Sequence, residues 1–351
     1  MGIGKVKVAV VGCGGEARHY ISHYTAMPEV DLILVQDIVH EKAEESAARF
    51  GAARWTTSFD EVLESGADII DVSTPNHLHF AQAVAALRAG AHVLVQKPMA
   101  PTVAECEEMI NTARQCGRSL GVYMSELENP INYELKRLVQ KGALGTVVSV
   151  RTRNAHKGGL IMKPKDLHWR GSLEKTGGGS FIQLAIHGVN LVQWILGQDI
   201  VRVAAFSKNM LTRDRLGGDD VTNAIAEFEN GVQATLESSY ITDGSAIELF
   251  GTGGFARIDE RDLSLRLDST YQGEYIQYAE PKTLVRYSRA EIVEKANADP
   301  WRYCQHQAFV RSVIEGQSPP VPGEIGLRDV KIIKAIYRSA EEGCAVTVMR
   351  R

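Results

Sequence analysis

The first 125 residues of the chain alternate between short apolar runs and helical patterns, and this alternation limits the possible folds more than any other feature. The apolar runs, rich in β-branched residues, are Val6–Val11, Leu32–Val35, Ile69–Val72, His92–Val95 and Leu120–Tyr123. The helical patterns between them are about Glu16–Ala26, Lys42–Phe50, Phe59–Glu64, His77–Ala89 and Val103–Cys116. Strands that alternate with helices predict a parallel, doubly wound sheet.

The rhythm changes near Asn129–Pro130. One helical pattern, Tyr133–Gln140, is followed mainly by strand signals: Thr146–Arg153, Val201–Ser207, Asn223–Phe228, Gln233–Tyr240, Ala246–Phe250 and Leu263–Leu267. Further helices are expected at Gly179–Leu196, about Pro300–Glu315 and Gly326–Glu342. Asn230-Gly231 between two strand signals predicts a hairpin turn. The sequence therefore predicts an α/β domain over residues 1–125 and an α+β domain over residues 126–351, with a mainly antiparallel or mixed sheet.

Length and composition narrow the class of protein. A chain of 351 residues is expected to form two domains. A net charge of −4 without blocks of like charge argues against nucleic acid as a partner. The five scattered cysteines are typical of a reduced cytosolic enzyme rather than a disulfide scaffold. No signal-peptide pattern or membrane-spanning apolar run is evident, so a cytoplasmic protein without a membrane partner is expected.

A glycine-rich loop joins the first expected strand to the first expected helix. Its residues follow the pattern G-x-G-x-x-A: Gly12, Cys13, Gly14, Gly15, Glu16 and Ala17. Gly12 permits a tight turn, Gly14 lets a pyrophosphate approach the backbone, and Ala17 lets the helix pack closely on the strand. The unpaired N–H groups at the helix start would hold the anion. The loop predicts a dinucleotide site, with Cys13 as a small loop residue rather than a reactive thiol.

An acidic residue, Asp37, follows the second expected strand. It stands roughly where a dinucleotide site places an acid on the ribose 2′-hydroxyl. Asp37 would repel a 2′-phosphate, and Ile38 offers no guanidinium to hold one. NAD is therefore the expected cofactor and NADP is less favoured. The alternative interpretation of the glycine loop and Asp37 is an ordinary glycine turn beside a surface aspartate.

A lysine ends the strand expected at His92–Val95. Lys97 is followed directly by Pro98, which lacks an N–H and pushes the preceding residue towards extended geometry. The carboxyl ends of strands face the ligand crevice in an open α/β sheet. Lys97 is therefore a candidate proton donor or acceptor, and a solvated strand-end lysine is the alternative.

Several of these segments together resemble the Gfo/Idh/MocA (glucose–fructose oxidoreductase, inositol dehydrogenase) family. The matching segments are Val72–His79, Gln96–Pro98, Gly142–Gly145, Trp169-Arg170, Gly177–Gly179, Gly231 and Phe250–Gly254. The resemblance implies an N-terminal Rossmann domain and a C-terminal domain with a large open sheet. It also implies nicotinamide-dependent oxidation of a secondary alcohol on a sugar or cyclitol, and a homodimer or homotetramer formed through the sheet.

The resemblance also implies roles for individual residues. The reactive lysine falls on Lys97, and the family's D-x-x-x-H helix falls on Gln183–His187. We expect His187 to act as the general base, Lys97 to donate a hydrogen bond to the same oxygen, and Gln183 to orient the substrate. Candidate substrate contacts are these three residues together with His156 and Tyr240. Candidate cofactor contacts beyond the glycine loop and Asp37 are Ser73, Thr74, Pro75, Asn76, His79, Gln96, Lys97, Trp169 and Arg170.

The chain departs from the family pattern at three places. Gln96 and Gln183 stand where the family usually has Glu and Asp, and the segment Met124–Pro130 lacks the usual arginine before the proline. With two negative charges removed from its neighbourhood, Lys97 is expected to lose its proton more readily than in carboxylate-bearing relatives. His187 would then be the one strong base.

Other readings of the sequence remain open. The fold could bind NAD as a regulator without turnover, or it could use NAD transiently in glycosidase or lyase chemistry through a keto-sugar. The pairs His19/His23 and His77/His79 resemble metal ligands, but neither has a third ligand nearby in the sequence, so no metal is expected. Asp219-Asp220 is expected at the start of a strand rather than as a catalytic carboxylate pair.

Overall fold

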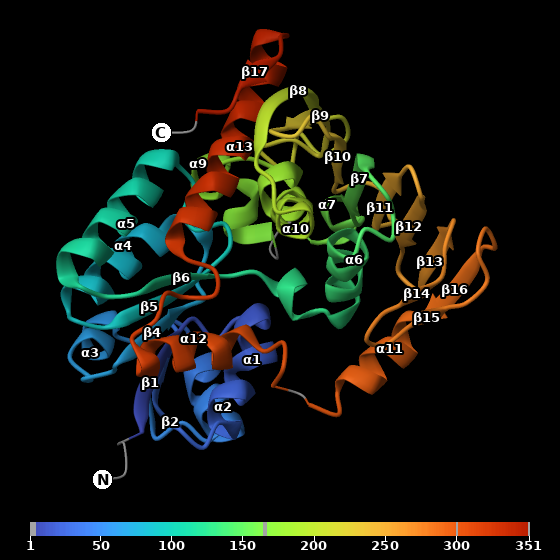
Figure 1. Cartoon of the computed structure of the whole chain (residues 1–351). Helices are drawn as coiled ribbons and strands as arrows, with labels where there is room; N and C mark the ends of the chain where they lie inside the picture. The colour runs from blue at the N-terminus through green and yellow to red at the C-terminus, as the bar shows by residue number, and fades with distance from the viewer. Residues whose placement is uncertain (1–4, 164–166, 300, 350–351) are drawn as a thin grey trace. The chain divides into compact units, whose positions relative to one another are not determined.

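The computed structural model describes residues 5–163, 167–299 and 301–349, and the chain divides into two compact units. Unit 1 contains the chain up to Met124 together with Cys304–Arg328. Unit 2 contains Ser125–Tyr303 and the chain from Asp329 onward. The expected division assigns Cys304–Arg328 to the second domain, whereas in the structure this stretch belongs to unit 1. Figure 1 shows the elements of both units.

Unit 1 is built on a six-stranded parallel sheet with the strand order β3-β2-β1-β4-β5-β6. The strands are β1 (Val6–Val11), β2 (Val30–Gln36), β3 (Arg54–Thr56), β4 (Ile69–Val72), β5 (His92–Gln96) and β6 (Leu120–Tyr123). The helices between them are α1 (Gly15–Ala26), α2 (His40–Phe50), α3 (Phe59–Leu63), α4 (Asn76–Arg88) and α5 (Val103–Cys116). The predicted parallel sheet is confirmed, although the short edge strand β3 was not predicted.

The strand order of unit 1 places a topological switch between β1 and β4. All residues of β4 and of β6 are buried, which explains why these segments are mainly apolar, with Asp71 as the one charged residue. The chain leaves β1 and β4 in opposite directions across the sheet, with β2 and β3 on one side and β5 and β6 on the other (Figure 1). In open α/β sheets, ligands bind outside the carboxyl ends of the strands at such a point.

A late segment of the chain completes unit 1. Helix α12 (Gln305–Glu315) packs against α1, and Pro322 forms a bridge to Gly121 in β6. The helix predicted over Pro300–Glu315 begins at Gln305, with Cys304 as its N-cap, and Pro300 lies outside the described residues. Helix α13 (Gly323–Glu342) begins one turn before the predicted Gly326 and continues into unit 2.

Unit 2 is built on a nine-stranded mixed sheet with the order β16-β13-β12-β11-β7-β10-β9-β8-β17. The strands are β7 (Val147–Ala155), β8 (Ile200–Lys208), β9 (Val221–Phe228), β10 (Gln233–Ser239), β11 (Ala246–Gly251), β12 (Gly254–Ile258), β13 (Asp262–Leu267), β16 (Val285–Ser288) and β17 (Val346–Thr347). β7 and β10 pair in parallel, and the other pairs are antiparallel, which confirms the predicted sheet. Strands β12, β16 and β17, and the small β14 (Tyr271–Gln272) and β15 (Gln277–Tyr278) pair, were not predicted.

The predicted hairpin turn joins β9 to β10. Gly231 has φ +85°, a left-handed conformation that glycine adopts without strain. The N–H of Phe228 donates to the carbonyl of Val232 at 2.9 Å, which closes the turn. The Asn-Gly prediction is confirmed.

The helices of unit 2 pack on its sheet or against one another. The main ones are α6 (Pro130–Gln140), the π-helical turn η3 (Phe181–Ala185), α10 (Ile186–Leu196) and α11 (Arg289–Ala296). The helix predicted over Gly179–Leu196 therefore begins with a π turn. By length and composition the stretch Leu173–Leu196 could cross a membrane, but 78% of its apolar window is buried within the fold, as in a core helix.

Candidate functional site

The glycine loop of unit 1 has the conformation that its sequence predicts. Gly12 has φ +95°, and a Cβ there would lie 2.7 Å from the carbonyl oxygen of Ser73, so only glycine fits between β1 and β4. A Cβ at Gly14 or Gly15 would meet no atom within 4 Å. The backbone at the start of α1 is therefore open on the side from which an anion would approach. Ala17, in the first turn of α1, is fully buried.

Asp37 anchors the loop from the end of β2. One carboxylate oxygen accepts the N–H of Cys13 at 2.9 Å, and the other accepts the N–H of Val39 at 2.9 Å. Each oxygen keeps a second lone pair, so the carboxylate can still accept a hydroxyl hydrogen. The side chain of Ile38 is 84% exposed beside it, and no cation takes that position.

Cys13 is a buried loop residue. Its thiol lies 3.5 Å from the carbonyl oxygen of Gln36. Burial raises the pKa of the Cys13 thiol to about 11, so the group is uncharged at neutral pH. This agrees with the prediction of a small loop residue rather than a reactive thiol.

The loops after β4 and β5 are tied together by His79. This side chain is fully buried, with Nδ1 2.9 Å from the carbonyl oxygen of Pro98 and Nε2 2.7 Å from that of Thr74. Burial lowers the pKa of His79. Pro75 caps α4, and Asn76 begins it as a buried residue. His79 therefore holds the loops after β4 and β5 in place, and its contact with the cofactor stays a prediction.

Gln96 and Lys97 end β5 at the same edge of the sheet. Gln96 is buried, and its Oε1 accepts the N–H of Lys97 at 3.0 Å. Lys97 is half-buried and is joined to Pro98 by a cis peptide bond. The amide that replaces the family's usual carboxylate is thus part of the packed strand end.

Ser73, a predicted cofactor contact, belongs to a buried polar group. Its hydroxyl donates to Asp71 at 2.7 Å and hydrogen-bonds Tyr20, and Tyr24 donates to Asp71 at 2.7 Å. Burial raises the pKa of Asp71, while the nearby His306 opposes that change. These side chains join α1 to β4 beneath the glycine loop.

In unit 2, Asp219 fixes the start of the helix that carries Gln183 and His187. Its buried carboxylate accepts the N–H groups of Gly179 and Phe181 at 2.9 and 3.0 Å. It also accepts the hydroxyls of Ser180, Thr222 and Tyr337. A Cβ on Gly179 would lie 2.0 Å from the Asp219 carbonyl oxygen, which explains the glycine run before the helix.

Asp220 is likewise satisfied by backbone donors, which are the N–H groups of Met210, Leu211 and Thr212. Both carboxylates therefore stabilise the backbone, and the two residues directly precede β9, so the predicted strand start is confirmed. The role of Asp219 as the cap of the helix was not predicted.

Gln183 lies in the π-helical turn, and His187 lies one turn later in α10. Gln183 is buried, whereas His187 is half-buried. Single π turns inside α-helices occur frequently at functional sites. Gly188 lets α10 approach β7 closely, because a Cβ there would lie 2.6 Å from Oδ1 of Asn154. Gly188 thereby holds α10 close to Asn154 near the end of β7, and His187 directly precedes it in the helix.

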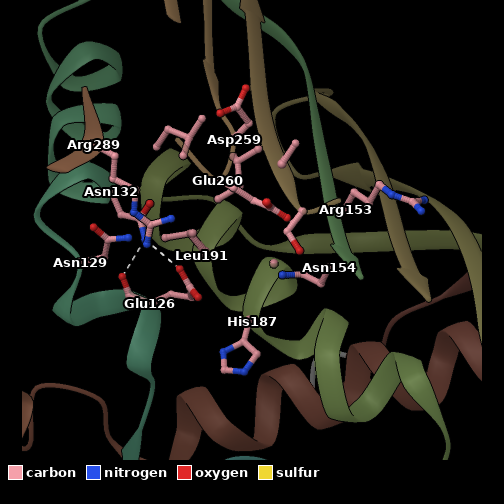
Figure 2. Close-up of a pocket in the computed structure, with 15 residues that line it drawn as sticks. Glu126, Asn129, Asn132, Arg153, Asn154, His187, Leu191, Asp259, Glu260 and Arg289 are labelled. Atoms are coloured by element: carbon pink, nitrogen blue, oxygen red, sulfur yellow. Dashed lines mark hydrogen bonds between the residues drawn. The ribbon is translucent and has the colours of Figure 1, made fainter. Parts of the chain in front are cut away.

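A pocket in unit 2 includes His187 (Figure 2). Its lining residues are mostly polar: Glu126, Asn129, Asn132, Arg153, Asn154, His187, Gly188, Leu191, Ser245, Ala246, Ile247, Ile258, Asp259, Glu260 and Arg289. In Figure 2 Glu126, Asn129 and Asn132 group beside Arg289, and the ring of His187 points away from them. Asn132 donates to Oε2 of Glu126 at 3.1 Å and to its carbonyl oxygen at 2.7 Å.

Two of these lining residues come from a segment that the sequence marked as unusual. Glu126 and Asn129 lie in Met124–Pro130, where the family usually brings an arginine. The departure therefore lies in the wall of the pocket that includes His187. Apart from His187, the other lining residues carried no sequence signal, because they come from six separate segments of the chain.

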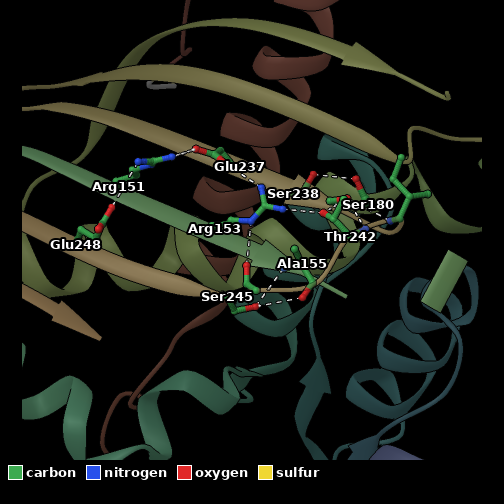
Figure 3. A network of polar contacts seen from close by, with 12 residues as sticks. Arg151, Arg153, Ala155, Ser180, Glu237, Ser238, Thr242, Ser245 and Glu248 are labelled. Carbon is green, nitrogen blue, oxygen red and sulfur yellow. Dashed lines mark hydrogen bonds and ion pairs between the residues drawn. The ribbon is translucent and has the colours of Figure 1, made fainter. Parts of the chain in front are cut away.

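Arg153, at the edge of the pocket, is held by a polar network across the sheet (Figure 3). It pairs with Glu237 at 3.0 Å and donates to the carbonyl of Gly244 at 2.9 Å. Glu237 also pairs with Arg151 at 3.0 Å. Arg153 is thus a fixed positive group rather than a mobile surface side chain.

The weaker substrate candidates lie together, but they do not line this pocket. The rings of His156 and Tyr240 are 5.1 Å apart. Tyr240 is buried in a small cluster with Leu167 and Leu216, and this burial raises its pKa well above the usual range. His156 is exposed, and its Nδ1 accepts the N–H of Gly158 at 2.9 Å.

The predicted site residues are divided between the two units. Lys97, Gln96 and the glycine loop belong to unit 1, whereas Gln183 and His187 belong to unit 2. Trp169 and Arg170 also belong to unit 2, where the guanidinium lies 4.7 Å from the centre of the indole ring. The proposed meeting of Lys97 with His187 stays a prediction.

Two family models match the chain over most of its length. The model described as an oxidoreductase family with an NAD-binding Rossmann fold matches residues 6–124, and the GFO/IDH/MocA C-terminal domain matches residues 133–257. The chain belongs to the Gfo/Idh/MocA oxidoreductase family.

Curated relatives of this family member include named sugar reductases and dehydrogenases. The 1,5-anhydro-D-fructose reductase of Ensifer adhaerens is 24% identical over 97% of both chains. The D-glucoside 3-dehydrogenase of Escherichia coli K12 is 25% identical over 97% of both chains. Among solved structures, the aldose-aldose oxidoreductase of Caulobacter crescentus in complex with glycerol is 28% identical, with a TM-score of 0.80 over 98% of this chain and 99% of that one.

Membership in the Gfo/Idh/MocA family establishes an NAD-binding oxidoreductase, and the unit 1 residues fit this cofactor. Gly14 and Gly15 leave the backbone open to the pyrophosphate, and Asp37 offers acceptors for a ribose. The fit rests on the shape of the backbone and on a carboxylate that the loop itself holds in place.

Proposed function

We propose that this protein is an NAD-dependent dehydrogenase that acts on a secondary alcohol of a sugar, sugar derivative or cyclitol. The observation that carries the proposal is the polar pocket around His187, in which carboxamides, carboxylates and guanidinium groups offer both donors and acceptors. Such a lining suits a molecule with many hydroxyl groups. The names of the curated sugar dehydrogenases and reductases support the same class of substrate.

In the proposed mechanism, NAD held by the glycine loop and Asp37 would supply the acceptor for the hydride of the carbinol carbon. His187 takes the hydroxyl proton as a general base, so that the alcohol becomes a ketone without leaving charge on its oxygen. Lys97 donates a hydrogen bond to that oxygen and stabilises the negative charge that develops during the reaction. Gln183 orients the substrate through its amide. The meeting of these side chains at one oxygen is part of the proposal, because they belong to different units.

The pocket lining favours a neutral polyhydroxylated substrate over an acidic one. Glu126, Asp259 and Glu260 contribute three carboxylates, whereas Arg153 and Arg289 contribute two guanidinium groups. The guanidinium of Arg153 already pairs with Glu237. We therefore expect neutral sugars and glycosides to react better than uronic acids.

The direct test is to mix the protein with NAD and a panel of sugars, cyclitols, glycosides and uronic acids, and to measure NADH and products. We expect NADH to form with a neutral member of the panel. Combining Lys97→Ala with His187→Ala should lower kcat/KM by about a thousandfold or more, because each group contributes to proton handling. The matched control combines Lys175→Ala with His40→Ala at exposed positions, and it should keep the wild-type rate.

The same measurement separates the other possible activities. Product without NADH accumulation would show transient oxidation in glycosidase or lyase chemistry, and NAD binding without any product would show a regulator. Undiminished NADH formation in the Lys97→Ala, His187→Ala protein would overturn the mechanism. Tighter binding of NADP than of NAD would refute the role of Asp37.

We further propose that the enzyme is a cytoplasmic homodimer or homotetramer that associates through the open sheet face of unit 2. Phe206 on β8 and Ile225 on β9 point to the same face and are 81% and 61% exposed. Exposed apolar side chains on adjacent strands are typical of an interface between subunits. Light scattering of the wild type and of Phe206→Glu tests this, and an unchanged mass would contradict it.

A further inference from the structure

A cluster of three potential metal ligands lies inside unit 1, away from the glycine loop. His23 comes from α1, whereas Cys304 and His306 come from the N-cap and first turn of α12. One ligand atom from each residue lies within 4.8 Å of the other two. The sequence analysis found no third ligand near His23, because its partners follow about 280 residues later and reach it only through the packing of α12 on α1.

The spacing of the cluster suits a tetrahedral ion. Zinc binds a thiolate at about 2.3 Å and an imidazole nitrogen at about 2.0 Å, so the sulfur and nitrogen ligands of one tetrahedron lie about 3.5 Å apart. Sγ of Cys304 lies 3.6 Å from Nδ1 of His23. The two imidazole rings have centroids 5.5 Å apart and face each other edge to face, which leaves space between them and the thiol.

The surroundings of His306 hold its ring in a fixed orientation. Tyr20 stacks on it with centroids 4.3 Å apart, and Tyr24 and Tyr123 pack at 5.3 and 4.6 Å. Oδ2 of Asp71 lies 3.7 Å from its Nε2. A carboxylate beside a ligating histidine commonly fixes the tautomer and increases the basicity of the ring. Asp71 lies on the Nε2 side of the ring, beyond hydrogen-bond distance, so Nδ1 is the nitrogen that we assign to the ion.

We propose that His23, Cys304 and His306 bind a zinc ion that joins α1 to α12. A thiolate with two imidazoles is a donor set that zinc prefers over magnesium or calcium. Three protein ligands leave the fourth tetrahedral position for water or another donor. Cys304 and His306 are buried, whereas His23 is half-buried, so the ion would enter from the side of His23.

The proposed ion has a structural consequence for the cofactor domain. Helix α1 starts at the glycine loop, and α12 belongs to the segment that returns to unit 1 late in the chain. A metal bond between the two helices would fasten this late segment to the helix that begins the dinucleotide site. Because the ion binds the folded arrangement of the three ligands, we expect it to raise the thermal stability of the protein.

The test uses the full chain without a histidine tag, first treated with chelator and then dialysed against zinc. We expect about one zinc per chain by elemental analysis. With cobalt(II) as a probe, we expect a thiolate-to-metal charge-transfer band and the strong visible bands of a tetrahedral site. Zinc should also raise Tm by several degrees.

Variants at the ligands and at exposed positions complete the experiment. Cys304→Ser and His23→Gln should weaken zinc binding at least a hundredfold and remove the rise in Tm, whereas Cys344→Ser and His40→Gln, at exposed positions, should match the wild type. NAD binding by the ligand variants reports that unit 1 is folded. Less than stoichiometric zinc, equal zinc binding by Cys304→Ser and wild type, or a cobalt spectrum without the thiolate band would overturn the proposal.

Discussion

The two halves of the proposed site, one in each unit, are built in different ways. In unit 1 the cofactor half comes from one short loop and the aspartate that ends the next strand. In unit 2 the pocket around His187 takes its walls from segments that are far apart in the sequence. A phosphate site made of backbone is therefore encoded locally by the spacing of glycines. A sugar pocket made of side chains depends instead on the tertiary structure.

The largest effect should follow from a change in the glycine loop of unit 1. Gly12→Ala puts a Cβ 2.7 Å from the carbonyl oxygen of Ser73 at a residue with φ +95°. The left-handed conformation alone costs about 1–2 kcal/mol for a residue with a side chain. We expect the free energy of unfolding to fall by about 3 kcal/mol and NAD affinity to fall by at least a hundredfold, measured by denaturation and calorimetry.

Gly14→Ala separates the loss of NAD affinity from the loss of stability. Gly14 has φ −71°, and a Cβ there meets no atom within 4 Å, so the fold should tolerate alanine. We expect stability within about 1 kcal/mol of wild type but NAD affinity reduced about tenfold or more, because the methyl group enters the space of the pyrophosphate. Wild-type NAD affinity in Gly14→Ala would show that the loop does not bind phosphate.

A change beneath the pocket of unit 2 should affect stability and turnover but not NAD affinity. Asp219→Asn leaves at least one buried backbone N–H at the start of the π-helical turn without a carboxylate acceptor. We expect a loss of about 3 kcal/mol in the free energy of unfolding. In addition, kcat should fall because Gln183 and His187 shift, while NAD affinity stays unchanged. The control is Asp214→Asn at an exposed position of the same loop, and equal stability of the two variants would contradict the capping role.

A change in the wall of the pocket should affect the binding of the substrate alone. Glu126→Gln keeps the shape of the side chain and its contact with Asn132 but removes the charge. We expect KM for the sugar to rise about tenfold with little change in kcat or in NAD affinity, since the interaction is present in both the ground state and the transition state. A change in NAD affinity without a change in KM would place Glu126 outside the substrate pocket.

Much of the fold was predictable because the sequence patterns that mark its strands lie within short stretches of the chain. The strands Val6–Val11, Ile69–Val72 and Leu120–Tyr123 were predicted with their observed bounds, because strands buried on both faces read as continuous apolar runs. The strand β3 and the strand β12 were missed. β3 has only three residues, and β12 begins with a glycine directly after the turn that follows β11.

The candidate site was predictable only where its chemistry is local. Gly12, Asp37 and Lys97 could be singled out from their neighbours in the chain. Asn154 could not, because it joins His187 in the lining of the pocket only through the contact of α10 with β7 at Gly188. Glu126 carried a partial signal, since its segment departs from the family pattern. The assembly of such residues depends on long-range contacts that no local pattern contains.

The smallest expected effect concerns Cys13, the one thiol inside the glycine loop. Burial raises its pKa to about 11, so the reactive thiolate forms only as the pH approaches that value, and the residue stays a neutral thiol through pH 9. We expect iodoacetamide at pH 8 to modify the exposed Cys344 and to leave Cys13 unmodified, as measured by peptide mass spectrometry. NAD affinity should not change on this treatment. Modification of Cys13 as fast as that of Cys344 would show that the loop opens in solution, and the locally encoded half of the site would then lack the fixed shape on which its recognition of NAD depends.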